Sequence, residues 1–303
     1  MNKNAVFQLV VAMSIFGSVG FFSNLTGLPA IELVWIRCIF AAVFLFIAWI
    51  ITGNFKKERW DRKELFYIVS CGIANVLNWV FLFKAFEMTS ITIAITLYHL
   101  APIMVLAVGT ILFKEKMTKF TYLAILICFI GTIGIVGANG FHMNSASWNG
   151  IIYSIIAACF YSATMILGKS ITKTSVYATT FLQMVIGLIV LLPFIHFFTY
   201  QAIETSQWIY VITTGIVHTG IVYLLFFSSI RQLPTSVVSF MIFIDPAVAI
   251  LLDIAVTGTH LKWLQLLGIL CIFVGLFYSL KANSYNIDTG QKKYMTCNPK
   301  KVG

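Results

Sequence analysis

Long apolar stretches, each of about 20 residues, recur from one end of the chain to the other. A stretch of this length can cross a bilayer core of roughly 30 Å, and a backbone in lipid must satisfy its own hydrogen bonds, so each stretch predicts a helix. The chain is 60% hydrophobic and 10% charged, which leaves too little polar surface for a water-soluble globule. We therefore expect an all-α polytopic membrane protein with ten transmembrane helices, near residues 5–23, 31–52, 65–86, 90–112, 120–138, 149–168, 177–198, 207–229, 234–256 and 263–281.

The two halves of the chain repeat one pattern at an offset of 144 residues. This offset places Pro102, in the fourth apolar stretch, on Pro246, in the ninth. It also superimposes Phe16 on Phe160, Ser18 on Ser162, Phe129 on Phe273 and Gly131 on Gly275. The pattern indicates one five-helix unit written twice, and because five is odd, the second unit is inverted in the membrane. We predict repeats over 1–143 and 144–282, and a disordered cytoplasmic tail over 283–303.

The net charge of +10 is unevenly distributed along the chain. If the N-terminus is cytoplasmic, the inner loops and termini hold nearly all Lys and Arg residues, and the outer loops or their edges keep only Lys84 and Lys262. This asymmetry follows the positive-inside rule, so we expect both termini on the cytoplasmic side of the cell membrane. The basic run at 56–63 then marks an inner loop rather than a nucleic-acid site. The first apolar stretch has no convincing cleavage site after it and is interpreted as a retained helix.

Motifs for metals, cofactors and catalysis are missing from the sequence. The six cysteines form no CxxC or zinc-ligand pattern, so neither a disulfide framework nor a metal site is indicated. There is no GxxxxGK[ST] phosphate loop, which argues against an ATP-driven pump. There is also no HExxH or GxSxG motif. We expect no cofactor and no enzymatic activity.

Several short segments follow the same order in both halves and carry a family resemblance. In the first half these are Trp35-Ile36-Arg37, the segment 85–90 before the Pro102 helix, and Lys114-Glu115-Lys116 before the Gly131 helix. In the second half they are the segment 230–235, Pro246, Gly268 and Gly275. With its ten stretches and its duplication, the chain resembles the EamA-type branch of the drug/metabolite transporter superfamily over nearly all of 5–281. Gly258-Thr259-His260 departs from this family's pattern, in which an acidic residue is common at that place.

The resemblance implies transport of a small metabolite, usually export, without ATP-binding machinery. The family handles amino acids, nucleosides and drug-like molecules, so the substrate is not named. Inverted repeats favour alternating access around a midplane site, driven by a proton gradient or by the substrate gradient alone. The partners expected are a small-molecule substrate and the lipid bilayer, with no nucleic acid, for a monomer or a homodimer. The alternatives are a non-transporting receptor or scaffold and an intramembrane enzyme.

Three ionisable residues fall at similar depth near the middle of their helices: His99, His218 and Asp245. Ionisable groups at membrane depth are costly and often mark substrate or proton pathways. Asp245 suits proton coupling or recognition of a cationic group, and His99 could share a proton with it or bind the substrate. The alternative for each is a structural hydrogen bond to a neighbouring helix.

Pro102 and Pro246 both predict a bent helix. Proline removes one helical hydrogen bond and frees a carbonyl one turn back, which can face a cavity. Their equivalent positions favour a shared cavity over two packing kinks.

Polar and aromatic residues on the neighbouring helices are further candidates to contact a substrate. Asn75 and Asn78 share one helix face, with Trp79 close by. The other candidates are Tyr98, Tyr161, Ser162, Thr164 and Tyr223. Such side chains also hold transmembrane helices together, so a packing role is the alternative.

Arg37 falls in the outer half of the membrane, together with Asp253 and with Glu32 at the edge of the second stretch. We expect Arg37 to form a buried ion pair with one of these carboxylates, either as a structural pair or as an outer gate.

Overall fold

The computed structural model describes residues 2–58, 60–89, 91–113, 119–137, 147–257, 262–264 and 266–275. Within these ranges all regular secondary structure is helical. Six helices are long and apolar enough to cross a membrane, and four shorter apolar helices accompany them. The protein is therefore an all-α polytopic membrane protein with ten transmembrane segments. The predicted tail at 283–303 lies outside the described residues.

The first half contains five membrane segments, of which the fourth is divided in two. Its elements are α1 (Lys3–Leu25), α2 (Ala30–Ile51), the short η1 (Asn54–Lys57), α3 (Arg62–Met88), α4 (Ile91–Tyr98) with α5 (Ala101–Phe113), and α6 (Lys119–Gly137). Capping residues fix two of the starts. The Asn2 side chain accepts from the backbone N–H groups of Asn4 and Ala5, and the Asp61 side chain accepts from that of Lys63.

The second half repeats this order, with extra interruptions. Its elements are α7 (Ser147–Ser170), α8 (Val176–Leu191), η2 (Leu192–Phe194), η3 (Phe197–Ala202), α9 (Trp208–Gly215), η4 (Ile216–Ile221), α10 (Val222–Ile230), α11 (Thr235–Met241), α12 (Ile244–Thr257) and a last helix, Leu266–Gly275. Here α9, η4 and α10 form one continuous membrane segment, and η4 is a π-helical stretch within it. The seventh segment ends at Leu191, earlier than the predicted 198, because Pro193 follows in a 3₁₀ turn.

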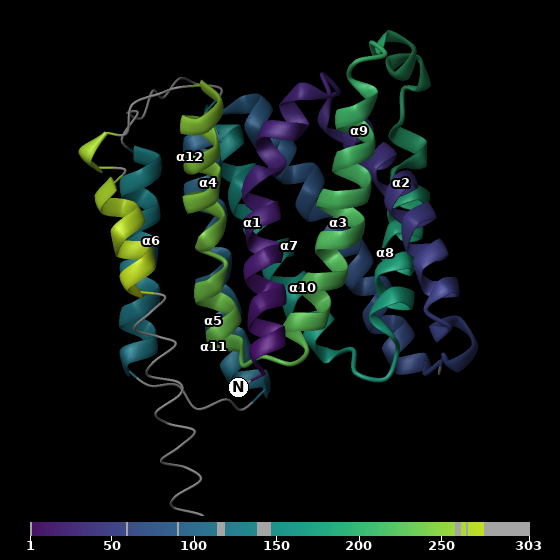
Figure 1. Cartoon of the computed structure of the whole chain (residues 1–303), viewed down its shortest axis with the longest axis horizontal. Helices are drawn as coiled ribbons and strands as arrows, with labels where there is room; N and C mark the ends of the chain where they lie inside the picture. The colour runs from purple at the N-terminus through teal and green to yellow at the C-terminus, as the bar shows by residue number, and fades with distance from the viewer. Residues whose placement is uncertain are drawn as a thin grey trace, which may run out of the picture.

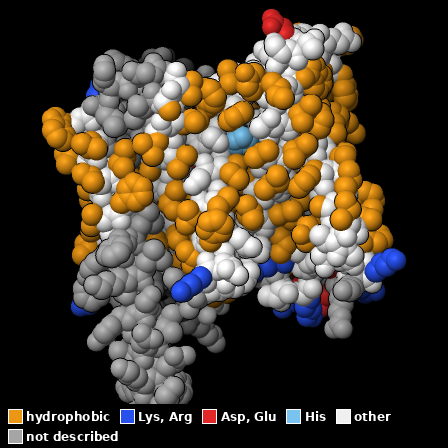
Figure 2. Space-filling model, in the orientation of Figure 1, with side chains coloured by type: hydrophobic (Ala, Val, Ile, Leu, Met, Phe, Trp, Pro, Cys, Tyr) orange, Lys and Arg blue, Asp and Glu red, His pale blue; other side chains and the backbone are white. Residues whose placement is uncertain are grey.

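The helices of the two halves run side by side in one bundle (Figure 1). Helix α3 packs along α7, α2 along α8, and α1 along α10 and α12, so each half contributes to the packing of the other. The bundle carries its lysines and arginines mainly at the end where the N-terminus lies, at the bottom of Figure 2. We call this the basic end. It includes the loops at 52–61, 171–175 and 231–234.

The surface of the bundle is apolar and its interior is partly polar. Large exposed side chains such as Phe7, at 69% exposure, and Ile111, at 79%, form an apolar belt (Figure 2). Arg37, Asn75 and Gln183 are instead buried inside. This arrangement fits a bundle that is surrounded by lipid and encloses polar groups.

The fifth and tenth segments pack through small residues. A Cβ added at Gly131 in α6 would lie 2.7 Å from the backbone oxygen of Gly268 in the last helix. Only a residue without a side chain permits so close an approach of two backbones. In the described structure these glycines therefore serve contacts within the chain.

Candidate functional site

Both proline-containing segments are broken just before the proline. In the fourth segment the helix is interrupted at His99 and Leu100, where the N–H of Leu100 bonds to Leu97 O at 3.1 Å. In the ninth segment it is interrupted at 242–243. Proline cannot donate the helical hydrogen bond, so the backbone tightens locally and some carbonyls become available. At the start of α5, beside this break, Ala101 O accepts a 3.1 Å hydrogen bond from Ser162 Oγ of α7.

Two pairs of equivalent residues touch each other at the centre of the bundle. Trp79 Nε1 donates a 2.7 Å hydrogen bond to the hydroxyl of Tyr223, which lies 144 residues later. The rings of His99 and Phe243 have the same sequence offset, and their centroids are 5.7 Å apart. Equivalent positions of two repeats meet only near the axis that relates them. These pairs therefore mark a pseudo-twofold axis, and the interface of inverted repeats is where carriers hold their substrate.

A polar and aromatic wall lines one side of this axis. Asn78 Nδ2 lies 3.2 Å from the Tyr98 hydroxyl and donates to Ala157 O at 2.8 Å. The ring of Tyr98 stacks on that of Tyr161, with centroids 5.1 Å apart and planes inclined by 14°. The structure thus brings together Asn78, Tyr98 and Tyr161 from three different helices.

Asp245 lies in the first turn of α12, beside this wall. Its side chain is half-buried, and its carboxyl group interacts electrostatically with the hydroxyl groups of Tyr98 and Tyr161. In the part of the chain that the structure describes, no hydrogen bond or ion pair reaches this carboxyl group. His99 is buried, and its Nδ1 is 2.8 Å from Ile95 O, while its Nε2 has no hydrogen-bond partner. Both groups can therefore still accept or donate a proton.

His218 lies in the π-helical stretch η4 of the eighth membrane segment. Its Nε2 is 2.8 Å from Ser18 Oγ of α1, and its Nδ1 is 3.4 Å from Thr213 O. The π-helical geometry widens the turn and is frequent at functional positions in helices. Asn75 forms its hydrogen bond with a different helix: its Nδ2 donates to Gln183 Oε1 of α8 at 3.3 Å.

Arg37 is buried against the same axis, and the partners that the structure shows for it are neutral groups instead of the predicted carboxylate. Its guanidinium lies 5.3 Å from the ring of Trp79, and its Nε donates to Thr219 Oγ1 at 2.9 Å. Glu32 lies 3.2 Å from His196 Nδ1 instead of pairing with Arg37. The difference arises because Glu32 lies more than one helical turn before Arg37 and is reached by the 196–200 loop. The side chain of Asp253 lies outside the described residues.

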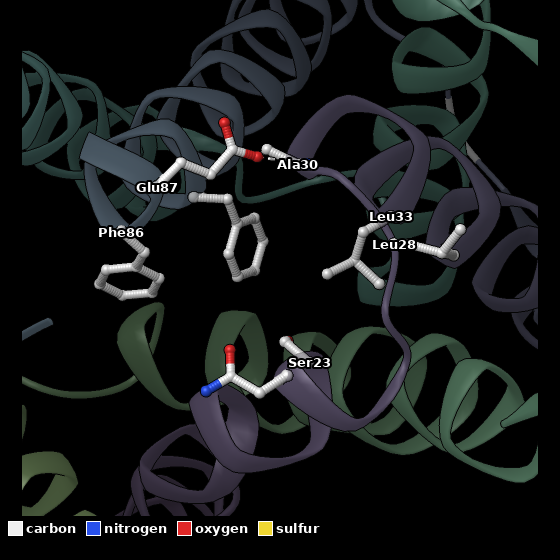
Figure 3. Close-up of a pocket in the computed structure, with 8 residues that line it drawn as sticks. Ser23, Leu28, Ala30, Leu33, Phe86 and Glu87 are labelled. Carbon is white, nitrogen blue, oxygen red and sulfur yellow. Dashed lines mark hydrogen bonds between the residues drawn. The ribbon is translucent and has the colours of Figure 1, made fainter. Parts of the chain in front are cut away.

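A pocket lies between the end of α1, the start of α2 and the end of α3, at the end of the bundle opposite the basic end, and Figure 3 shows its lining residues. Its volume is ≈ 190 Å³, and it is lined by Ser23, Asn24, Leu28, Ala30, Leu33, Phe83, Phe86 and Glu87. Glu87 Oε1 accepts a 3.0 Å hydrogen bond from the N–H of Ala30, at the start of α2, as the dashed line shows. An anionic group is favourable at such a helix N-terminus.

The basic end is closed by hydrogen bonds between the two halves. Glu64 of α3 accepts from the backbone N–H groups of Thr172, Lys173 and Thr174 at 2.9, 2.7 and 2.8 Å. It also accepts from the hydroxyl groups of Thr172 and Thr174. Nearby, Glu58 Oε1 accepts from the N–H of Ser175 at 2.8 Å. These contacts tie the start of α3 to the loop between α7 and α8.

Charged side chains add to this closure. Arg231 donates to Thr174 O at 2.8 Å and to Thr179 Oγ1 at 2.8 Å. Burial lowers the pKa of Arg231 to about 10. Asp61 and Lys173 form an ion pair, and the hydrogen bond from Lys173 holds the pKa of Asp61 below its usual value. We call Glu58, Asp61, Glu64 and Arg231 with the loop 171–175 the basic-end clasp.

The clasp and the pocket are related by the repeat. Arg231 meets Thr174 at the basic end, and Glu87 meets Ala30 at the opposite end, each pair shifted from the other by the same 144 residues. The two contacts therefore occupy equivalent places in the repeats, but a cationic side chain makes the one at the basic end and an anionic side chain makes the other. Neither the clasp nor the role of Glu87 was identified from the sequence. The only sequence signal for them is that acidic residues, Glu64 and Glu87, flank the third apolar stretch.

The comparisons with known proteins identify the family of the chain and show similar transporters. Residues 3–137 and 148–281 each match the model of the EamA-like transporter family. A transporter of Bacillus subtilis (strain 168), named as uncharacterized, is 48% identical over 280 residues, covering 92% of this chain and 90% of that protein. An uncharacterized transporter of Archaeoglobus fulgidus is 23% identical over 270 residues, covering 88% and 93%. A protein of known crystal structure shares the fold, with a TM-score of 0.79 at 14% identity over 91% of this chain and 98% of that one.

Proposed function

The chain belongs to the EamA-like transporter family, and from this premise we propose that it moves a small metabolite across the cell membrane by alternating access. The observation that carries the proposal is the pseudo-twofold axis marked by Trp79 and Tyr223. Arg37, Asn78, His99, Asp245 and His218 gather around this axis. Two inverted halves can rock against each other around such a site and expose the same groups to either side in turn.

The direction we propose is export, with both termini in the cytoplasm. The basic end then faces the cytoplasm, as the positive-inside rule requires. The clasp closes that end, and the pocket beside Glu87 opens at the other, as expected for a carrier about to release its cargo outside. Labelling tests the orientation: a cysteine introduced at Asn54 should react with an impermeant reagent only after the cell membrane is permeabilised.

Transport itself is tested by counterflow in liposomes containing the purified full-length chain. Amino acids, nucleosides and organic cations are each offered with and without a pH gradient. We expect flux for one class of small metabolite. Well-folded protein that gives no flux for any class would contradict the carrier and favour a receptor or scaffold.

Energy coupling is proposed to pass through Asp245. Its carboxyl group lies in the first turn of α12, just after the break in the ninth segment and beside Tyr98 and Tyr161, without a cation that would hold it charged among the described residues. Such a group can take up a proton on one side of the membrane and release it on the other. The Asp245→Asn protein should fold and exchange substrate but lose its response to a pH gradient. Undiminished proton-coupled flux in this variant would exclude the role.

A further inference from the structure

Arg37 is a buried cation whose surroundings are neutral. Its side chain is 1% exposed, and it lies in the middle part of α2. Its Nε donates to Thr219 Oγ1, and its Nη2 lies 3.5 Å from the backbone oxygen of His218. The rings of Trp79 and Phe83 cover the guanidinium at 5.3 and 5.4 Å. None of these groups carries a negative charge.

The guanidinium also keeps unused hydrogen-bonding capacity. Arg37 Nη1 has no hydrogen-bond partner although it is buried. Among the residues that the structure describes, no carboxylate forms an ion pair with Arg37. A buried charge without a counter-charge is strongly unfavourable, and arginine remains protonated in proteins. The described groups around Arg37 supply no negative charge, and the unpaired Nη1 leaves room for an anionic ligand to supply it.

A route from the pocket to Arg37 is short. Phe83 lines the pocket, and the centroid of its ring also lies 5.4 Å from the Arg37 guanidinium. Leu33, which also lines the pocket, precedes Arg37 by four residues on α2, so both side chains lie on one helix face. A movement of the Phe83 ring would join the pocket to Arg37.

We propose that Arg37 binds the carboxylate of the transported solute, with Phe83 as the side chain that separates this subsite from the pocket. The proposal rests on the transport function proposed above. An arginine fork matches a carboxylate in shape and charge. One guanidinium supplies one positive charge, which suits a monoanion better than a phosphate dianion. Phe83, Phe86 and Leu33 offer an apolar surface for the body of the solute.

The test measures binding to the purified full-length protein through its thermal stabilisation, so that it does not depend on flux. The probes are 3-phenylpropionate, hexanoate and L-phenylalanine, each compared with its own amide, and 2-phenylethyl phosphate. At least one carboxylate should bind about tenfold or more tightly than its amide, which corresponds to about 1.4 kcal/mol. This comparison uses the wild-type protein and needs no variant. Binding of every carboxylate no better than its amide would overturn the proposal, as would a preference for the phosphate.

The variants Arg37→Gln and Arg37→Lys then assign the preference to its residue. Arg37→Gln should abolish the preference for carboxylate over amide, and Arg37→Lys should retain part of it because the charge remains. Lys63→Gln makes the same change of charge at an exposed position and should leave the preference intact. A carboxylate preference that survives in folded Arg37→Gln would refute the assignment. Because binding and counterflow are separate measurements, a failure of transport with an intact preference would contradict the proposed function and leave only the carboxylate subsite at Arg37 standing.

Discussion

Trp79 and Tyr223 occupy equivalent positions in the two halves and are bonded to each other. The indole Nε1 donates to the phenol oxygen at 2.7 Å, and the rings meet edge to face with centroids 5.2 Å apart. Both side chains are buried. The contact joins the two halves at their pseudo-twofold axis, and the Trp79 ring lies 5.3 Å from the Arg37 guanidinium.

Removing the acceptor of this bond should destabilise the protein. Tyr223→Phe leaves the Trp79 N–H buried and unpaired, which we expect to lower the free energy of unfolding by about 1–3 kcal/mol. The measurement is denaturant unfolding in detergent micelles. Trp79→Phe and the double variant complete a double-mutant cycle, in which we expect a coupling of about 1 kcal/mol. Strictly additive losses would show that the two side chains do not stabilise each other.

The clasp predicts local opening when Glu64 is changed. Glu64→Gln loses the negative charge, and its amide NH₂ would face the N–H groups of the loop 172–174. Hydrogen bonds to charged groups contribute about 1.5–3 kcal/mol each. We expect hydrogen exchange at 172–174 to be at least about tenfold faster, since tenfold corresponds to about 1.4 kcal/mol.

A second acidic residue provides the control for this experiment. Glu204 is exposed at the opposite end of the bundle, and its carboxylate accepts only a long 3.4 Å contact from Ser206 Oγ among the described side chains. Glu204→Gln should leave exchange at 172–174 unchanged. If Glu64→Gln behaved in the same way, Glu64 would not hold the loop.

The Asp61–Lys173 pair predicts a weak dependence of stability on pH. Lys173 lowers the pKa of Asp61, so the pair contributes stability above the unfolded-state pKa of about 3.9 and loses it as the pH falls through the folded-state pKa. At the alkaline end the pKa of Lys173 is raised, so its contribution is complete below about 10.4 and is lost at higher pH.

Unfolding temperatures of the wild-type protein and Asp61→Asn between pH 3 and 7 check this dependence. The two proteins should differ most near neutral pH and converge as Asp61 becomes protonated. The difference should also shrink with added salt, because both side chains are accessible to ions. A gap that stayed constant over this pH range would mean that the charge of Asp61 is irrelevant.

Much of the fold could be predicted because lipid imposes simple rules on sequence. The apolar stretches located the membrane segments, and most ends of the described helices fall within a few residues of the predictions. The repeat indicated the inverted architecture. The π-helical stretch at 216–221 left no such signal, since no proline or charge run marks it. Within it His218 lies 2.8 Å from Ser18, which comes 200 residues earlier, and a contact so distant in sequence leaves no local pattern.

The candidate site could be predicted only as a set of residue types at one depth. Asn78, Tyr98 and Tyr161 do meet, but their contacts depend on how each helix is rotated, which one sequence does not specify. The same holds for Arg37. Its charge suggested a carboxylate partner, but the packing of the helices places the neutral side chains of Thr219 and Trp79 beside it. Glu64 was overlooked because an acidic residue at a helix start is ordinary, and its partners lie more than 100 residues away in sequence.

Two glycines on α1 predict opposite effects of the same substitution. A Cβ at Gly17 would lie 2.6 Å from the backbone oxygen of Asp245, whereas a Cβ at Gly20 meets nothing within 4 Å. Gly17→Ala should therefore push α12 away and lower the free energy of unfolding by about 1–3 kcal/mol. Gly20→Ala should be neutral or stabilise by up to about 1 kcal/mol, since alanine favours the helix. Denaturant unfolding in detergent measures the free energy of unfolding of both variants. Equal changes in this free energy would mean that α1 and α12 do not pack this closely.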